Sequence, residues 1–161
     1  MQASVTLHMS APPERVWSLV SDVTRIGTFS PETFEAEWLN GATGPAPGVH
    51  FRGHVRRNGK KWFTYWTKCT ITDCVPGRDF AFGVDGPGGQ PTVTWSYHFE
   101  ANGDGTDVTE SFQLEHTYRG SRLYEKLAGR ARTRTNVDNM RATLERIRAV
   151  AEAPGTSGPT D

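Results

Sequence analysis

The chain has 161 residues, which suits one domain with a sizeable hydrophobic core. Its 18 basic and 18 acidic residues cancel, which excludes a whole-protein field that would attract nucleic acid or a membrane surface. The apolar runs are too short to span a bilayer, and the start of the chain does not resemble a signal peptide. We therefore expect a cytoplasmic protein with no nucleic acid partner and no stable membrane insertion.

The chain opens with a predicted strand followed by a predicted helix. From Gln2 to Met9, apolar and polar residues alternate with the period of two that gives a strand one apolar face. Ser10 is a candidate helix cap, and Pro12-Pro13 follows where missing N–H groups do no harm. The apolar residues after Glu14 then recur at helical spacing and include Trp17.

Two further elements precede a loop. Asp22 to Phe29 predicts a second short helix, which ends before Pro31 because the residue preceding proline avoids helical conformations. Thr33 to Leu39 alternates again, with Phe34 among its apolar residues. The turn-forming composition of residues 40–48 predicts a loop.

Four turn signals then separate five apolar segments. They lie at Asn58-Gly59, Pro76-Gly77, residues 86–89 and residues 102–105. Asn-Gly between alternating segments is a strong hairpin signal, and short turns between successive strands predict an antiparallel meander.

A long helix is predicted from Ser121 to Glu152, and the composition of residues 153–161 predicts a disordered tail. The fold class is therefore α+β: a curved seven-stranded antiparallel sheet wrapped around a long C-terminal helix, with two short helices between the first two strands. We expect one domain over residues 1–152. One helix cannot fill such a sheet, so a cavity is expected between them.

Strand parity assigns side chains to the face that meets the long helix. The predicted inward residues are Phe51, Gly53, Val55, Phe63, Tyr65, Thr67, Cys69, Ile71, Phe80, Phe82, Val84, Val93, Trp95, Tyr97, Phe99, Val108, Glu110, Phe112, Leu114 and His116. Glu110 is the most informative, because a carboxyl group on a buried face has a raised pKa. The alternatives for Glu110 are an arginine partner or a strand end that reaches solvent.

Two other residue pairs do not indicate a site. Cys69 and Cys74 lie roughly 16 Å apart on an extended strand, too far for a disulfide. His50 and His54 lie about 13 Å apart on a strand, too far to share a metal ion. We therefore predict packed thiols and no metal.

The long helix has no large apolar side chain between Leu127 and Val137. Small residues there leave room for a cavity, or else this stretch extends past the sheet into solvent. The helix is also rich in arginine, which indicates either a solvated face or a surface for an acidic carrier protein or a lipid membrane.

Four segments resemble one known family. They are SVTLHMSAPPERVWSLVSDVTRIGTFSP, EAEWLNGATGPAPGVHFRGHVRRNGKKW, PGRDFAF and TWSYHFEANGDGTDVTESF. Together the chain resembles the START-like superfamily, also called Bet v 1-like, SRPBCC or helix-grip, and most closely its bacterial polyketide cyclase/dehydrase and lipid-transport group. The resemblance covers residues 4–150. It implies a cavity that binds lipids, sterols, hormones or polyketides, and only a minority of such proteins catalyse a reaction.

The first functional hypothesis is binding or transport of a hydrophobic small molecule, such as a lipid or polyketide, without a cofactor. The alternative is a polyketide aromatase/cyclase or dehydratase in which Glu110 works with Tyr65 and Tyr97 as acid–base groups. The expected ligand contacts are Trp17, Phe29, Phe34, Phe51, Tyr65, Trp95, Tyr97, Glu110, Phe112 and Met140. A monomer and a homodimer are both compatible with the sequence.

Overall fold

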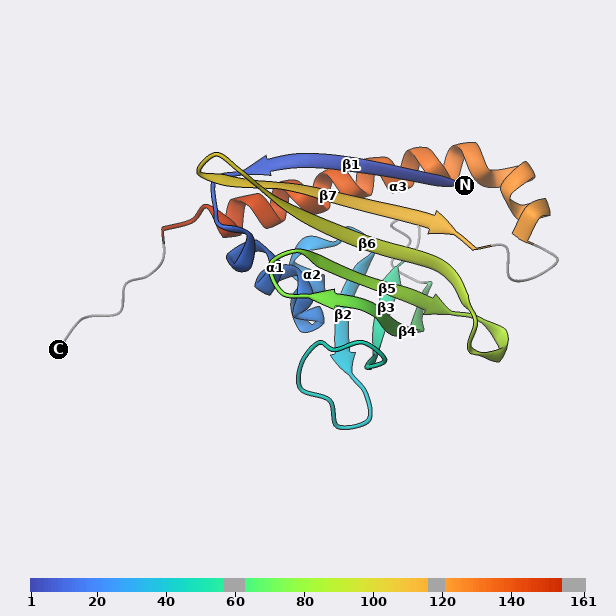
Figure 1. The fold of residues 1–161 in the computed structure, drawn as a ribbon. Coiled ribbons are helices and arrows are strands. Elements are labelled where there is room, and N and C mark those ends of the chain that lie inside the picture. The colour runs from blue at the N-terminus through green and yellow to red at the C-terminus, as the bar shows by residue number, and fades with distance from the viewer. Residues whose placement is uncertain (57–62, 116–120, 155–161) are drawn as a thin grey trace.

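A computed structural model describes residues 1–56, 63–115 and 121–154. The α+β fold predicted from the sequence is confirmed: a curved seven-stranded antiparallel sheet packs against one long C-terminal helix, with short helices after the first strand (Figure 1). The strands are β1 (Gln2–Met9), β2 (Thr33–Trp38), β3 (His50–Arg56), β4 (Thr64–Val75), β5 (Asp79–Asp85), β6 (Pro91–Asn102) and β7 (Gly105–Leu114). The helices are α1 (Pro13–Ser21), η1 (Val23–Arg25), α2 (Ile26–Phe29), η3 (Pro87–Gly89) and α3 (Ser121–Ala151).

The strand order is β1-β7-β6-β5-β4-β3-β2, so consecutive strands from β2 to β7 form a meander and β1 closes one edge beside β7. Gly77 and Gly103 supply the positive φ that two of the tight turns require. The predicted Asn58-Gly59 turn and most of the predicted C-terminal tail lie outside the described residues. Figure 1 shows α3 running along β1 and β7.

The hydrophobic core lies at the C-terminal half of α3. Leu144, Ile147 and Ala151 are buried there against Val16 and Leu19 of α1 and the inner face of the sheet. Each fully buried aliphatic side chain of this kind contributes roughly 1.5–3 kcal/mol to folding. This packing anchors one end of α3.

The start of α1 differs from the prediction. The helix begins at Pro13, Pro12 occupies the cap position, and no side chain caps the helix. Ser10 instead donates its backbone N–H to the carboxylate of Glu152 at 2.8 Å. Proline has no backbone N–H, so the two prolines at the start of the helix leave fewer N–H groups that require a capping acceptor. Ser10 is also too far from the first turn of the helix to cap it.

Two aromatic residues expected at the cavity or on the inner face are not buried there. A β-bulge in β2 sets Thr33 opposite Val55 and Glu35 opposite His54, so Phe34 is the extra residue and turns to the outer face. Its ring packs against that of His54 at 4.4 Å. Phe63 precedes the first paired residue of β4 and is 53% exposed, although its ring lies 5.8 Å from that of the cavity residue Tyr65.

Candidate functional site

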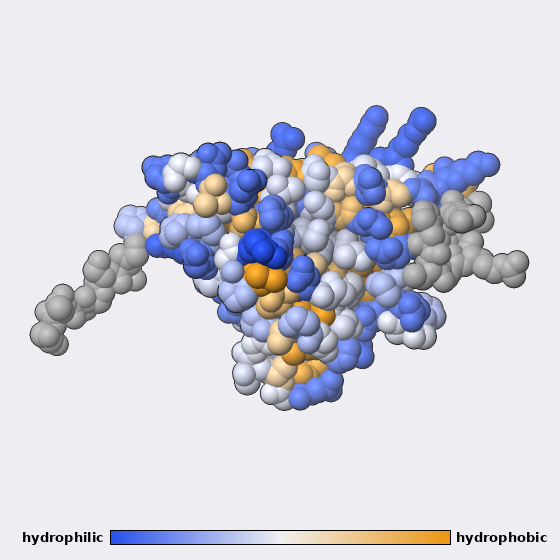
Figure 2. Space-filling view, viewed as in Figure 1, coloured by the Kyte–Doolittle hydropathy of each residue, from blue (hydrophilic) through white to orange (hydrophobic). Residues whose placement is uncertain are grey.

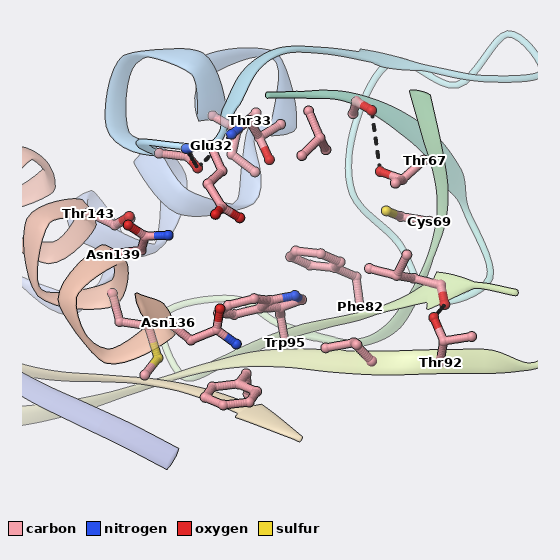
Figure 3. A pocket seen from close by; sticks show the side chains of 18 of the residues that line it. Glu32, Thr33, Thr67, Cys69, Phe82, Thr92, Trp95, Asn136, Asn139 and Thr143 are labelled. Atoms are coloured by element: carbon pink, nitrogen blue, oxygen red, sulfur yellow. Dashed lines mark hydrogen bonds between the residues drawn. The ribbon is translucent and has the colours of Figure 1, made fainter. Parts of the chain in front are cut away.

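The inner face of the sheet and α3 border a cavity of about 670 Å³. This volume lies within the range of roughly 300–1,000 Å³ that is typical of small-molecule sites. Most of the wall is apolar. The side chains from the sheet include those of Phe51, Val55, Phe82, Val84, Val93, Trp95, Phe112 and Leu114, and α3 adds Met140. Figure 3 shows this wall with Trp95 and Phe82 projecting from the sheet toward α3.

Glu110 and Tyr97 form a buried polar pair in this wall. They are direct partners in the β6–β7 ladder, so their side chains share the inner face. The hydroxyl of Tyr97 donates a hydrogen bond of 2.8 Å to Oε1 of Glu110. Glu110 is only 4% exposed, and none of the described arginines forms a salt bridge with it. Glu110 is therefore neither solvated nor paired with a cation in the described part of the chain.

Burial determines the ionisation of this pair. Desolvation raises the pKa of Glu110 to about 8, and the hydrogen bond from Tyr97 opposes only part of that rise. Burial and the neighbouring carboxyl group also raise the pKa of Tyr97 well above its usual value. Both groups are therefore mainly neutral at pH 7.

Tyr65 lies in the cavity wall but not beside this pair. The strand ladder aligns Glu110 with Tyr97, Tyr97 with Phe80, and Phe80 with Cys74 of β4. Tyr65 is nine residues before Cys74 on that strand. It therefore borders a different part of the cavity, and the strand pairing does not place it beside Glu110.

Apart from Met140, the wall contributed by α3 is polar, which was not predicted from the sequence. Arg132, Asn136, Asn139 and Thr143 line the cavity at helical steps of four, three and four residues. Figure 3 shows Asn136, Asn139 and Thr143 on the side of α3 that faces the sheet. The stretch without large apolar residues thus borders the cavity, although Leu127 at its start is 77% exposed. The spacing of these four polar residues was the signal that could have revealed this face.

A second polar contact connects α3 with the segment before β2. The two terminal guanidinium nitrogens of Arg132, Nη1 and Nη2, donate to the carboxylate of Glu32, at 2.8 and 2.7 Å. Each side chain is 16% exposed, and both residues line the cavity. Glu32 reaches this position because Ser30 accepts the backbone N–H groups of Glu32 and Thr33 and thereby shapes the turn.

The expected ligand contacts divide into two groups. Phe51, Tyr65, Trp95, Tyr97, Glu110, Phe112 and Met140 lie in the cavity wall. Trp17, Phe29 and Phe34 do not. Trp17 donates its indole N–H to the backbone carbonyl of Asp79 at 3.0 Å, which ties α1 to β5. Phe29 is buried in the core beside a space of about 20 Å³, which holds no more than a water molecule. Phe34 is turned outward by the bulge.

Other groups do not form a reactive site within the described residues. Cys69 and Cys74 are free thiols, and burial raises the pKa of Cys69 to about 12, so it stays protonated. No cluster of three or more His, Cys, Asp or Glu side chains is arranged to bind a metal ion in residues 1–56, 63–115 and 121–154. The predicted inward residue His116 lies outside these ranges.

The surface is mainly hydrophilic on the side shown in Figure 2, and apolar residues form separate patches. Arg130, Arg134, Arg141 and Arg146 of α3 are exposed, and Arg146 also donates to the carbonyl of Phe29 at 3.1 Å. None of the helices in the described part of the chain combines the length and hydrophobicity needed to cross a bilayer.

Comparison with known proteins identifies relatives. A family model described as "Polyketide cyclase / dehydrase and lipid transport" matches residues 1–152, and the sequence matches no curated protein. The Polyketide_cyc-like protein Cgl2372 from Corynebacterium glutamicum is 26% identical, covers 94% of this chain and 89% of its own, and has a TM-score of 0.56.

Two further solved structures share the fold. TTHA0849 from Thermus thermophilus is 18% identical, with 96% of this chain and 100% of that chain covered and a TM-score of 0.68. The di-domain ARO/CYC BexL from the BE-7585A biosynthetic pathway is 20% identical with a TM-score of 0.69. That match covers 96% of this chain and 50% of BexL, so this chain spans about half of the BexL chain.

Proposed function

Because the chain belongs to the polyketide cyclase/dehydrase and lipid-transport family, we propose that it binds a hydrophobic small molecule, a lipid or a polyketide, in the cavity between the sheet and α3. The observation that carries this proposal is the cavity of about 670 Å³, whose apolar sheet wall is interrupted by a few polar groups. Apolar area provides affinity at such a site, and a few polar groups orient the ligand.

Ligand screening tests this proposal. The purified protein is mixed with a panel of lipids and aromatic polyketides, and its melting temperature is measured. A bound ligand raises the melting temperature in a concentration-dependent way, because it binds the folded state and not the unfolded one. Native mass spectrometry of protein purified from its own host identifies a ligand that co-purifies with it.

A pair of variants on β6 locates the binding site. Val93 lines the cavity, whereas Ser96 lies on the opposite face of the same strand. Val93→Phe fills part of the cavity, so we expect weaker binding. Ser96→Phe adds the same ring outside the cavity, so binding is retained. Equal binding by the two variants would place the ligand elsewhere and contradict the proposal.

A second function is favoured by the pair of Glu110 and Tyr97. A carboxyl group with a pKa of about 8 exchanges its proton near neutral pH, which suits a general acid or base. In an aldol cyclisation, the ionised fraction of Glu110, which is the minor form at pH 7, would remove the α proton of a ketone. The enolate would form a carbon–carbon bond with a second carbonyl carbon, and that carbonyl oxygen would receive the proton from Glu110. Tyr97 would orient the carboxylate throughout.

One variant separates catalysis from binding. Glu110→Gln keeps the shape and hydrogen-bonding capacity of the side chain but cannot exchange a proton. If the protein is a cyclase, Glu110→Gln should no longer turn over a poly-β-ketone substrate but should bind it with unchanged affinity. Unchanged product formation in Glu110→Gln would exclude Glu110 as the acid–base group.

A further inference from the structure

Two buried oxygen atoms in the cavity wall have no hydrogen-bond partner among the described residues. They are Oε2 of Glu110 and Oδ1 of Asn136, and the two residues are 4% and 3% exposed. A buried polar atom without a partner typically destabilises a fold, and native proteins contain few of them. Two such atoms in one cavity wall therefore indicate a partner that is bound there.

The two residues belong to the same region of the cavity. Phe112 lies two residues after Glu110 on the same face of β7 and packs against Trp95 with ring centroids 5.5 Å apart. Met1 at the start of β1 contacts Glu125 of α3, and Ser10 just after β1 contacts Glu152, so α3 runs along β1 and Asn136, near the middle of α3, lies level with Val5, the ladder partner of Glu110. The terminal carboxyl and amide torsions have broad energy wells, so a small rotation turns either oxygen toward the cavity.

The charges around this region do not favour an ionic ligand. Arg132 lines the cavity, and its guanidinium group already makes two hydrogen bonds to Glu32. Glu110 accepts from the neutral hydroxyl of Tyr97 and is itself mainly protonated at pH 7. A neutral carboxyl group presents one O–H donor, and the amide oxygen of Asn136 is an acceptor.

We propose that Glu110 and Asn136 together recognise an uncharged ligand group that carries both an acceptor and a donor, such as a primary amide or a hydroxyl beside a carbonyl, and that the cavity rejects carboxylate ligands. This inference rests on the proposed binding function and specifies its ligand class. A fatty acid anion is disfavoured, because its charge would be buried beside Glu110 without a cation of its own.

Three naphthalene probes with similar shape test the proposal. They are 2-naphthamide, which carries the donor and acceptor; 2-isopropenylnaphthalene, which is apolar; and 2-naphthoate, which is anionic at pH 7. Their dissociation constants are measured on the full chain by fluorescence at pH 7. We expect 2-naphthamide to bind about tenfold more tightly than 2-isopropenylnaphthalene, and 2-naphthoate to bind most weakly.

Matched variants of α3 connect this preference to Asn136. Asn136→Leu removes an unpartnered buried oxygen, and we expect it to fold and to lose the preference for the amide probe. Asn139 also lines the cavity but does not have such an oxygen, so Asn139→Leu keeps the preference. The melting temperature of each variant reports whether it folds, and Asn136→Ala provides a second variant that should lose the preference.

The outcomes separate this inference from the binding function. Equal affinity for all three probes, or tightest binding of 2-naphthoate, overturns the inference and leaves a hydrophobic binding protein. An amide preference that survives in Asn136→Leu also overturns it. Failure of all three probes and of the wider lipid and polyketide panel contradicts the binding function itself.

Discussion

Tyr97 donates its hydroxyl hydrogen to Glu110 across 2.8 Å, and both side chains are buried in the cavity wall. The two residues face each other across adjacent antiparallel strands, so the sheet itself holds the pair together. A carboxyl group in this setting is more stable protonated than ionised, which has consequences for stability and for ligand binding.

The stability of the protein should depend on pH through Glu110. The unfolded chain releases this proton near the ordinary pKa of 4.5, whereas the folded chain keeps it up to about pH 8. Between these values the folded state binds the extra proton, so the free energy of unfolding falls as pH rises, by at most about 1.4 kcal/mol per pH unit. Above pH 8 this contribution levels off. Urea unfolding at pH 5.5, 6.5 and 7.5 measures it.

Glu110→Gln is the control for this pH dependence. The variant has no proton to release at this position, so the slope due to Glu110 disappears while all other titrating groups remain. The difference in unfolding free energy between the native protein and the variant should therefore change steadily over this window. A constant difference would show that Glu110 ionises at its ordinary pKa.

Tyr97→Phe should affect Glu110 more than it affects packing. The ring is retained, but neither carboxyl oxygen of Glu110 then has a partner among the described residues. Because this hydrogen bond lowers the pKa of Glu110, its loss raises that pKa further. We expect a loss of about 1–3 kcal/mol in unfolding free energy.

Carboxyl ¹³C NMR titration of Glu110 measures the accompanying pKa change. Tyr65→Phe is the matched control, since Tyr65 lines another part of the cavity. The same pKa change in both variants would mean that the hydrogen bond from Tyr97 does not influence Glu110.

The contact between Arg132 and Glu32 should stabilise the position of α3 relative to the segment that precedes β2. Arg132→Met and Glu32→Gln each leave one group of a mostly buried pair without this partner. A double-mutant cycle on the free energy of unfolding should give a coupling of about 1–3 kcal/mol, because charged bidentate hydrogen bonds are strong when they are shielded from water. A coupling near zero would show that solvent screens the pair.

The outer face of the sheet carries an aromatic stack that should not influence the cavity. His54 stacks on Trp66 with ring centroids 4.3 Å apart and packs at a tilt against Phe34 at 4.4 Å, while Arg52 lies over the Trp66 ring and Arg56 over the Phe34 ring. Trp66 is 40% exposed, so Trp66→Ala should lower the unfolding free energy by about 1 kcal/mol.

Ligand affinity distinguishes the two faces of the sheet. Trp66→Ala should leave the dissociation constant of a cavity ligand unchanged, whereas Trp95→Ala removes part of the cavity wall and should weaken binding. Fluorescence titration with one apolar probe compares the two variants. Equal weakening would show that the outer stack supports the cavity.

Much of the fold could be predicted because its signals are local. The alternation in β1 and in β6 and the helical spacing in α1 depend on neighbouring residues only. The meander could be predicted from the short turns, because two strands joined by a turn of a few residues pair in antiparallel orientation. Parity also set Phe51, Trp95 and Glu110 on the inner face, because an undisturbed strand keeps its alternation.

The errors occurred where alternation is interrupted or where a distant segment decides the environment. The bulge in β2 turned Phe34 outward, and no sequence pattern marked it. Trp17 was expected at the cavity, but its indole N–H binds a carbonyl 62 residues away. Tyr65 and Glu110 both lie on the inner face of the sheet, but the pairing register of the strands places them at different parts of the cavity.

The sequence by itself thus determined the secondary structure, the meander and the inward face of most strands, because each depends on spacing along the chain. Only the tertiary structure decided which side of α3 borders the cavity and that Arg132 binds Glu32 from 100 residues away. It also decided that Glu110 and Asn136 each keep an oxygen without a partner among the described residues. These features depend on how α3 lies across the sheet. That position is set by the packing of Leu144 and Ile147 in the core at the other end of the helix.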